Sequence, residues 1–223
     1  MKLLALDTSS LACTAAVLHD GAVLERHALE AKAHTRLLVP MIRELLSAAS
    51  LAPADLDAIV LGNGPGSFIG IRIGASVAQG LAFGAGVPIV PVSSLAAVAA
   101  EALDSSGIAR VLVAQDAHMG EVYVAGFARG EQDLPVAEGA AVLEPIGRVA
   151  QAGEHGAWYA AGEAWQRYPE LLAANAGRLA GVLDVRWPRA RYLLALGRRA
   201  LAAGASIDPR DLEPAYVRER VTA

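Results

Sequence analysis

Residues 57–74, DAIVLGNGPGSFIGIRIG, form the stretch that decides the fold. The apolar run up to Gly62 is typical of a buried strand, and the glycines and proline that follow predict a tight turn. Beyond the turn, apolar and small residues predict a helix over residues 69–84, and PIVPV at 88–92 predicts a further strand. The stretch therefore predicts a strand–helix–strand crossover, the connection that joins parallel strands.

The residues before this crossover predict three short strands and a helix. The strands cover residues 2–7, 12–18 and 22–29, and Asp20-Gly21 suits a hairpin turn because both residues tolerate positive φ. Apolar residues at intervals of three and four predict a helix over residues 34–50. Three meandering strands followed by crossovers resemble the ribonuclease H-like core of the actin, sugar-kinase and Hsp70 group. We therefore expect an α/β, two-lobed actin-like fold with mixed sheets flanked by helices.

The remaining sequence predicts a second lobe and a returning helix. After a helix near 94–103, turn residues at 104–107 indicate a boundary, and residues 110–117 and 121–128 predict paired strands. Pro188 opens a last helix that Gly204 ends. We expect a first lobe over residues 1–103, a smaller second lobe over 104–187, and a segment 188–223 that packs back on the first.

Composition and charge exclude several classes of protein. The chain has 223 residues, 54% of them hydrophobic, which argues against disorder. Its single cysteine, Cys13, excludes intramolecular disulfides. A net charge of −4 argues against a protein that binds nucleic acid by itself. The start lacks the length of an export signal, and every apolar run is interrupted by Gly, Pro or a charge, so we expect a cytoplasmic protein without membrane spans.

The charge is unevenly distributed along the chain. Residues 176–223 hold 9 Arg against 5 acids, which leaves 10 Lys and Arg against 18 acids in residues 1–175. The basic end is either a solvated or internally paired face, or a docking surface for an acidic partner or RNA.

The glycine-rich turn has two interpretations. A strand-to-helix loop of this kind can bind a nucleotide or another anion through backbone N–H groups. Yet no Lys-Ser/Thr pair follows the glycines, and the third glycine of a dinucleotide fingerprint is absent. The alternative is a tight turn whose small residues Gly70, Gly74 and Ala78 let a neighbouring helix approach closely. The candidate anion residues are Asp7, Gly64, Gly66, Ser67 and Arg72.

Catalytic and metal-binding patterns are not found. His34 begins the first long helix, but a metal site on one helix face needs a second ligand four residues on, where Leu38 stands. Ser9 and Ser67 lack the context of a nucleophile elbow. Asp116 and Glu121 flank the turn of DAHMGEVY, either as a carboxylate pair or as turn-forming residues. We expect no metal, no resident cofactor and no catalytic residue.

MKLLALDTSS, GNGPGSFIGIRIG, DAHMGEVY and EPAYVRERV together resemble the bacterial TsaB family of tRNA threonylcarbamoyladenosine (t6A) biosynthesis proteins, which is related to the glycoproteases. The resemblance implies a non-catalytic subunit that docks and activates the catalytic subunit TsaD. It also implies that the subunit helps to recruit the ATPase TsaE, and that ATP or ADP binds only at an interface shared within the complex. It further implies that the chain contacts tRNA indirectly and forms a homodimer when it is alone.

The docking surface that we expect lies on the first two helices. Its residues are His34, Leu37, Leu38, Met41, Ile42, Leu45, Gly70, Ile73, Gly74 and Val77. The sequence departs from the family pattern at Ile69, where Thr is usual, and at His118, where many members have Arg. The alternative function is an enzyme of the same fold, either a small-molecule kinase or a glycoprotease-like peptidase, with Asp7 holding a metal-nucleotide.

Overall fold

The computed structural model describes residues 1–30, 32–148 and 158–217. The chain divides into two compact units. Unit 1 comprises Met1–Ala97 and Pro188–Ala215, and unit 2 comprises Val98–Trp187 and the residues after Ala215. The first division between the units lies inside helix α3 (Ser94–Ser106), and thus before the expected boundary at residue 103.

Unit 1 is built on a five-stranded mixed sheet. Its strands are β1 (Leu3–Asp7), β2 (Ala12–His19), β3 (Ala22–Leu29), β4 (Ala58–Gly62) and β5 (Ile89–Val92), in the order β3-β2-β1-β4-β5. The first three strands are antiparallel, whereas β4 runs parallel to β1 and β5 parallel to β4. Asp20 and Gly21 both have positive φ in the hairpin turn. The predicted meander and crossover are confirmed.

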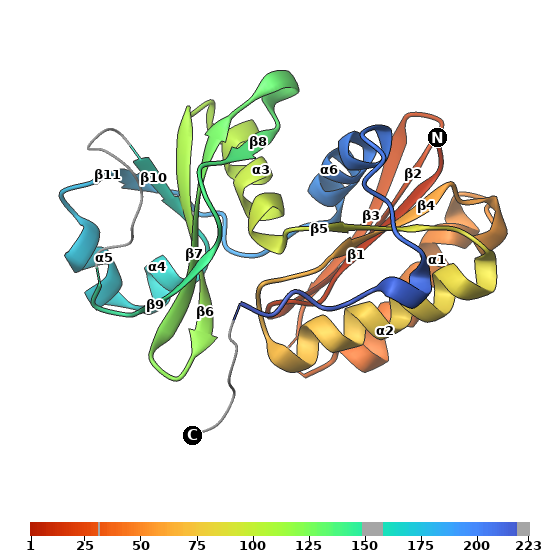
Figure 1. The fold of residues 1–223 in the computed structure, drawn as a ribbon, viewed down its shortest axis with the longest axis horizontal. Coiled ribbons are helices and arrows are strands. Elements are labelled where there is room, and N and C mark those ends of the chain that lie inside the picture. The colour runs from red at the N-terminus through yellow and green to blue at the C-terminus, as the bar shows by residue number, and fades with distance from the viewer. Residues whose placement is uncertain (31, 149–157, 218–223) are drawn as a thin grey trace. The chain divides into compact units, whose positions relative to one another are not determined.

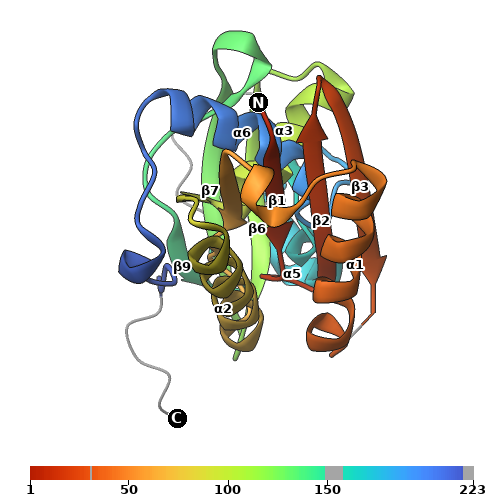
Figure 2. The ribbon, with the colours of Figure 1, turned by 90° about the vertical axis from the view of Figure 1, so that its right-hand side faces the viewer.

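Helices cover both faces of this sheet (Figure 1, Figure 2). Leu4 and Leu6 of β1 share one hydrophobic cluster with residues of α1 (His34–Ala48) and α2 (Phe68–Ala85). Leu3 and Ala5 point to the other face and pack against α6 (Ala190–Ala202). Because successive side chains of a strand alternate between faces, α6 lies on the opposite side of the sheet from α1 and α2.

Helix α2 is mostly apolar, and it continues without a break although it contains four glycines. Ser67 caps its start by accepting a hydrogen bond from the Gly70 N–H at 3.3 Å, and Gly86, with φ 71°, ends it. Within the described residues α2 is the one helix whose length and composition would suffice to cross a membrane, a test that core helices of soluble proteins also pass. Its inner side packs on the sheet of unit 1.

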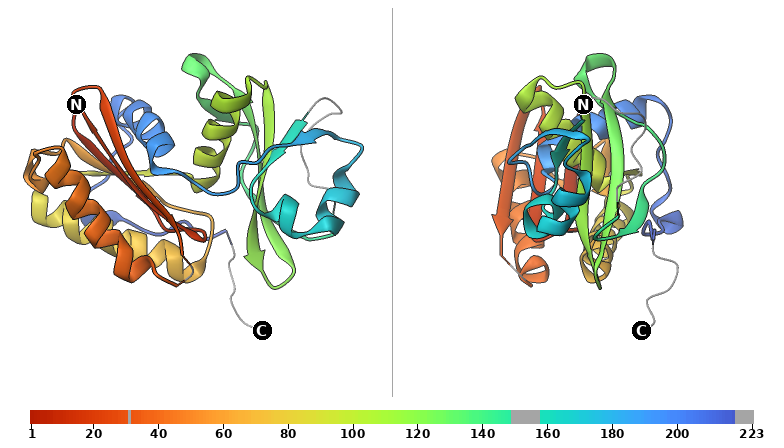
Figure 3. Two further views of the ribbon diagram at one scale, coloured as in Figure 1. Left: turned by 180° about the vertical axis from the view of Figure 1, so that it is seen from behind. Right: turned by 90° about the vertical axis from the view of Figure 1, so that its left-hand side faces the viewer.

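Unit 2 contains a six-stranded sheet (Figure 3). The strands are β6 (Arg110–His118), β7 (Glu121–Arg129), β8 (Pro135–Ala137), β9 (Val142–Pro145), β10 (Trp158–Ala161) and β11 (Leu179–Val182), with two short helices, α4 (Ala164–Arg167) and α5 (Pro169–Asn175). The order is β11-β10-β6-β7-β8, and β9 also pairs with β7. The predicted pairing of β6 with β7 is confirmed, and Trp158 and Trp165 fill the core beside it.

Candidate functional site

The carboxyl end of β1 carries the buried carboxylate Asp7. Its Oδ1 accepts hydrogen bonds from the N–H and the hydroxyl of Ser9, at 2.7 and 2.8 Å. Its Oδ2 accepts a hydrogen bond of 2.6 Å from the hydroxyl of Ser94, the first residue of α3. Both carboxylate oxygens are therefore engaged by groups of the chain itself.

Asp7 is also completely shielded from solvent, with 0% of its surface exposed. Burial raises the pKa of its carboxyl group above the ordinary value, although the hydrogen bonds from Ser94 and Ser9 act in the opposite direction. A Cβ atom at Gly62 would lie 1.9 Å from Asp7 Oδ2, so the neighbouring strand needs glycine here. A metal-nucleotide would have to displace this packing before Asp7 could reach it.

The glycine-rich loop folds against the same strand end. The Ser67 N–H donates to the Ser9 carbonyl at 2.6 Å, and the Gly64 N–H donates to Ser94 Oγ at 3.0 Å. A Cβ atom at Gly66 would lie 2.2 Å from the Ser9 carbonyl oxygen. The loop amides of Gly64 and Ser67, which could have cradled an anion, thus already have partners within the chain.

The C-terminal part of unit 1 adds a further layer over the loop. The Asn63 side-chain amide donates to the Glu213 carbonyl at 2.9 Å, and a Cβ atom at Gly64 would lie 3.4 Å from the Ala215 carbonyl oxygen. Leu212, the residue before Glu213, is buried in the unit 1 core. Of the candidate anion residues, Asp7, Gly64, Gly66 and Ser67 share this network, whereas Arg72 stacks over the ring of Phe68, 3.4 Å from its centroid.

The expected docking residues divide into two groups, and those that face inward require a correction. Leu38 and Leu45 are 0% exposed and Ile42 is 3% exposed, all within the core between α1 and the sheet. They cannot themselves form a partner surface. The side of α1 that carries these three residues packs on the sheet.

The expected small-residue edge of α2 also faces inward. A Cβ atom at Gly70 would lie 2.0 Å from the Thr8 carbonyl oxygen, and one at Gly74 would lie 2.7 Å from Thr8 Oγ1. Ala78 is fully buried in the same cluster. The close approach that Gly70 and Gly74 permit is therefore to the end of β1, and not to a neighbouring helix as expected.

A different set of residues forms the outer surface of these two helices. Leu37, Met41, Ile73 and Val77 are partly buried at the edge of the core. Beyond them lie exposed apolar side chains that the sequence analysis did not select, namely Val39, Ile69 and Phe83. The apolar periodicity of the two helices could have indicated these residues. Only the position of the sheet, however, shows which helix face is buried and which is exposed.

The outer surface of α2 also has its own stripe of small residues. Ser76, Gly80 and Gly84 follow one another at intervals of four, and all three are exposed. No atom outside the local backbone lies within 4 Å of a Cβ placed at Gly80 or Gly84. We call the surface formed by Leu37, Met41, Ile69, Ile73, Ser76, Val77, Gly80, Phe83 and Gly84 the outer helix surface.

His34, at the start of α1, lies close to the backbone of β2. Its Nε2 is 3.3 Å from the Ala12 carbonyl oxygen, and the ring is partly buried. Among residues 1–30, 32–148 and 158–217, no three His, Cys, Asp or Glu side chains gather as metal ligands would. The absence of a metal site stays a prediction.

Unit 2 holds a second polar cluster, around Asp116 at the end of β6. Asp116 Oδ1 accepts hydrogen bonds from the His118 N–H at 2.8 Å and the Tyr168 hydroxyl at 2.9 Å. Its Oδ2 lies 3.2 Å from His118 Nδ1 and 3.4 Å from Arg167 Nε. These contacts support the turn-forming interpretation of Asp116. Arg167 and Tyr168, about fifty positions away in sequence, had no signal that would connect them to this turn.

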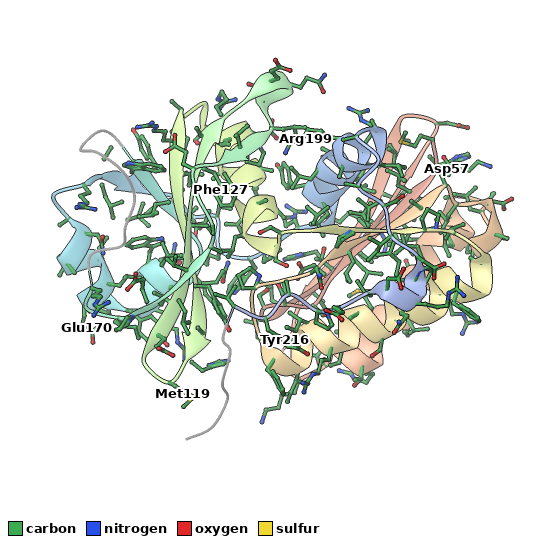
Figure 4. The ribbon with its side chains drawn as sticks, viewed as in Figure 1. Asp57, Met119, Phe127, Glu170, Arg199 and Tyr216 are labelled. Carbon is green, nitrogen blue, oxygen red and sulfur yellow. The ribbon has the colours of Figure 1, made fainter. Side chains whose placement is uncertain are left out.

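Burial affects another acid beside this cluster. The pKa of Glu163 is raised, mainly because burial penalises its charged form, while a hydrogen bond of 2.9 Å from Trp187 Nε1 partly compensates. The turn that joins β6 to β7 contains three successive residues with positive φ, His118, Met119 and Gly120. Figure 4 shows Met119 at the end of this hairpin.

Comparisons with known proteins agree with this architecture. A family model described as "TsaD: tRNA N6-adenosine threonylcarbamoyltransferase" matches residues 27–176. The "tRNA threonylcarbamoyladenosine biosynthesis protein TsaB" of Escherichia coli K12 is 37% identical over 227 residues, which cover 99% of this chain and 96% of the relative. The protein of the same name from Haemophilus influenzae is 35% identical and covers 100% and 95%. The chain belongs to the TsaB family.

Solved structures similar to this TsaB-family chain include "YeaZ from Pseudomonas aeruginosa", with a TM-score of 0.89, 36% identity and coverage of 96% of this chain and 99% of that one. A second Pseudomonas aeruginosa structure, titled as a protein with similarity to peptidase YEAZ, has a TM-score of 0.90 at 36% identity and covers 97% and 99%. These matches, with the TsaD-type model, establish the actin-like, ribonuclease H-like fold expected from the sequence.

The two positions at which this TsaB-family chain departs from the expected pattern are both open to solvent. Ile69 is 69% exposed on the outer helix surface, and the His118 side chain is 69% exposed at the hairpin tip. Ile69 adds apolar area to the surface of α2, and His118 places an imidazole ring where the family pattern has a guanidinium group.

Proposed function

We propose that this chain is a non-catalytic accessory subunit in the biosynthesis of t6A in tRNA, and that it docks and activates a TsaD-type catalytic subunit through the outer helix surface. The observation that carries the proposal is this surface, in which apolar side chains adjoin small residues on two neighbouring helices. The names of the TsaB relatives support the pathway.

The apolar part of the surface is suited to association. Leu37 and Met41 on α1 and Ile73 and Val77 on α2 pack at their base against the unit 1 core. Because packing against the core already restricts the rotamers of these side chains, they lose less conformational entropy when a partner covers them. Ile69 and Phe83, each 69% exposed, add area that a monomer leaves in water. An exposed apolar patch of this kind is typical of a protein–protein interface.

The small residues decide which kind of element fits. At Ser76, Gly80 and Gly84 little side-chain bulk separates the α2 backbone from a partner. Helices usually pack with axes 8–10 Å apart, and small residues at the contact favour the lower end of this range. We therefore expect a helix of the partner to lie along α2, beside α1.

A sister protein of the same fold is the occupant that we propose. The TsaD-type model matches residues 27–176, a range that contains both α1 and α2. A catalytic subunit with the same pair of helices could present a similar surface, so that the two pairs pack as a bundle. When the catalytic subunit is absent, a second copy of this chain would occupy the same surface.

The packing around Asp7 supports a role without catalysis. Both carboxylate oxygens accept hydrogen bonds, and the loop amides of Gly64 and Ser67 are used within the chain. We propose that any ATP or ADP binds at an interface shared with the catalytic subunit, that a TsaE-type ATPase joins the complex there, and that tRNA is contacted through the complex. The proposed location is the cytoplasm, where tRNA is modified.

Two variants test the docking surface by size-exclusion chromatography with purified TsaD. Met41→Asp places a charge in the apolar part, and Gly80→Leu fills the small-residue stripe at a position where an added Cβ meets no atom outside the local backbone within 4 Å. Both should abolish the complex. Val136→Asp, at a 50% exposed position of unit 2, is the matched control and should leave it intact. Complex formation by Gly80→Leu at wild-type strength would refute the proposed surface.

Reconstitution tests the accessory role itself. Modification of an unmodified tRNA transcript by TsaD and TsaE should require this chain, and the Gly80→Leu variant should fail to support it. Calorimetry of the isolated chain with Mg-ATP distinguishes the kinase alternative, since tight binding with turnover would assign catalysis to this subunit.

A further inference from the structure

Helix α6 presents a basic face on unit 1. Arg191, Arg198 and Arg199 are exposed, and the helix Ala190–Ala202 contains no Asp or Glu. Figure 4 shows the Arg199 side chain extending from α6. Arg191 and Arg198 are seven residues apart, which places them on one side of the helix about 10 Å from each other.

Most neighbouring arginines are neutralised by acids of the chain. Arg186 is 2.8 Å from Asp184, and Arg210 is 2.7 Å from Asp208. By contrast, the guanidinium groups of Arg191 and Arg198 lie within ion-pair distance of no carboxylate in the parts of the chain that the structure describes. These two positive charges are therefore available to another molecule.

The stability of α6 explains only part of this arrangement. Arg198 and Arg199 lie near the carboxyl end of the helix, where cations interact favourably with the helix dipole. Arg191 lies in the first turn, where a cation is unfavourable. Glu25 accepts a hydrogen bond from the Arg191 backbone N–H at 3.1 Å, but this contact does not involve the guanidinium. The Arg191 guanidinium lies 5.8 Å from the centroid of the Tyr192 ring, but the helix dipole gives no reason for a cation at this position.

We propose that Arg191, Arg198 and Arg199 contact the phosphate backbone of RNA. Guanidinium groups bind phosphates in a bidentate manner, and a row of them two helical turns long can reach successive phosphates. A protein partner fits this face less well, because protein interfaces depend on buried apolar or aromatic anchors. The large exposed apolar residues of the described chain include none between positions 189 and 205.

The position of α6 allows RNA and a protein partner to bind together. Leu193 and Leu194 pack on the sheet face formed by Leu3 and Ala5, whereas α1 and α2 cover the face formed by Leu4 and Leu6. A catalytic subunit docked on the outer helix surface would leave the basic face of α6 uncovered. The RNA would then be the tRNA substrate of the complex, an identification that rests on the proposed function.

Fluorescence anisotropy of a labelled, unmodified tRNA transcript tests the proposal over a range of salt concentrations. Because the chain carries a net charge of −4, the measurement uses its complex with the catalytic subunit. The double variant Arg191→Gln/Arg198→Gln should weaken tRNA binding about tenfold at low salt and reduce the salt slope by about two, roughly one for each lost phosphate contact. The control Arg186→Gln/Arg210→Gln removes the same charge from paired positions and should change neither value.

The remaining outcomes also decide between explanations. An unchanged affinity and slope in the Arg191→Gln/Arg198→Gln complex would refute the proposal. Loss of TsaD or TsaE binding with tRNA affinity retained would identify an acidic protein surface instead of RNA. If the wild-type chain forms no complex with TsaD, the proposed function fails. The same anisotropy series on the isolated chain at about 50 mM salt then decides the RNA contact by itself.

Discussion

The same substitution at two glycines of α2 should change stability in opposite directions. In an exposed helix interior, alanine is more favourable than glycine by about 1 kcal/mol. At Gly80 no atom outside the local helix backbone lies within 4 Å of the added Cβ, so Gly80→Ala should stabilise unit 1 by about 0.5–1 kcal/mol. At Gly70 the added Cβ would meet the Thr8 carbonyl oxygen at 2.0 Å, a backbone atom that cannot rotate away.

The loss at Gly70 can be worked out from its contacts. Separating α2 from the end of β1 amounts to overpacking, which costs about 1–3 kcal/mol. It also breaks the buried hydrogen bond of 2.7 Å from Thr8 Oγ1 to the Gly70 carbonyl oxygen, worth about 1 kcal/mol. After the gain in helix propensity of about 1 kcal/mol is subtracted, Gly70→Ala should destabilise the protein by about 1–3 kcal/mol.

Thermal and urea unfolding, followed by circular dichroism, measure both effects. A change of 1 kcal/mol moves Tm by about 2–4 °C in a chain of this size. We expect Tm to rise for Gly80→Ala and to fall for Gly70→Ala, with unchanged helix content before the transition. A rise for both variants would show that α2 can move away from β1 without penalty, and would refute the close packing on which its inner and outer faces are assigned.

Three further predictions concern the core, a buried acid and the start of α6. Leu38→Ala should lower the free energy of unfolding by about 2–5 kcal/mol and Met41→Ala by clearly less, measured in urea, because only Leu38 is fully buried. The raised pKa of Glu163 means that its folded form holds the proton more tightly, so a stabilising contribution present below pH 4.5 should be lost as the pH rises through the folded-state pKa. Glu163→Gln, which keeps an oxygen for Trp187, should flatten the dependence of Tm on pH over this range. Glu25→Ala should reduce stability by about 1 kcal/mol in the same urea assay, since the first turn of α6 loses the acceptor for an N–H group.

The local sequence patterns predicted the elements of unit 1 well because each had its own signal. Periods of two and of three to four residues distinguished strands from helices, and Asp20-Gly21 supplied turn residues that accept positive φ. The short elements of unit 2 after Val142 had no comparable signal. Strands such as Val142–Pro145 and Trp158–Ala161 contain four residues each, too few to establish a period.

The candidate site was harder to predict because it depends on which side of a helix meets the sheet. The stripe of α1 contains Leu37, Leu38 and Met41 at suitable spacing, yet only Leu38 is fully buried. The network around Asp7 joins positions 7, 9 and 94, and Ser94 gives no sign in sequence that its hydroxyl reaches a carboxylate 87 residues earlier. Contacts at this separation come from the topology of the sheet.

The packing of the glycine-rich loop and the orientation of the outer helix surface have one physical origin. Gly70 and Gly74 allow α2 to approach the end of β1 so closely that Thr8 contacts both, and this contact fixes the rotation of α2 about its axis. With 3.6 residues per turn, Gly80 then lies about 80° from Gly70 and about 120° from Gly74 around the helix, and it is exposed. The residues that fill the region beside Asp7 therefore also determine which side of α2 a partner can approach. A chain that opened this region for a nucleotide would have to release Thr8 from α2, and so could not keep the outer helix surface in its present orientation.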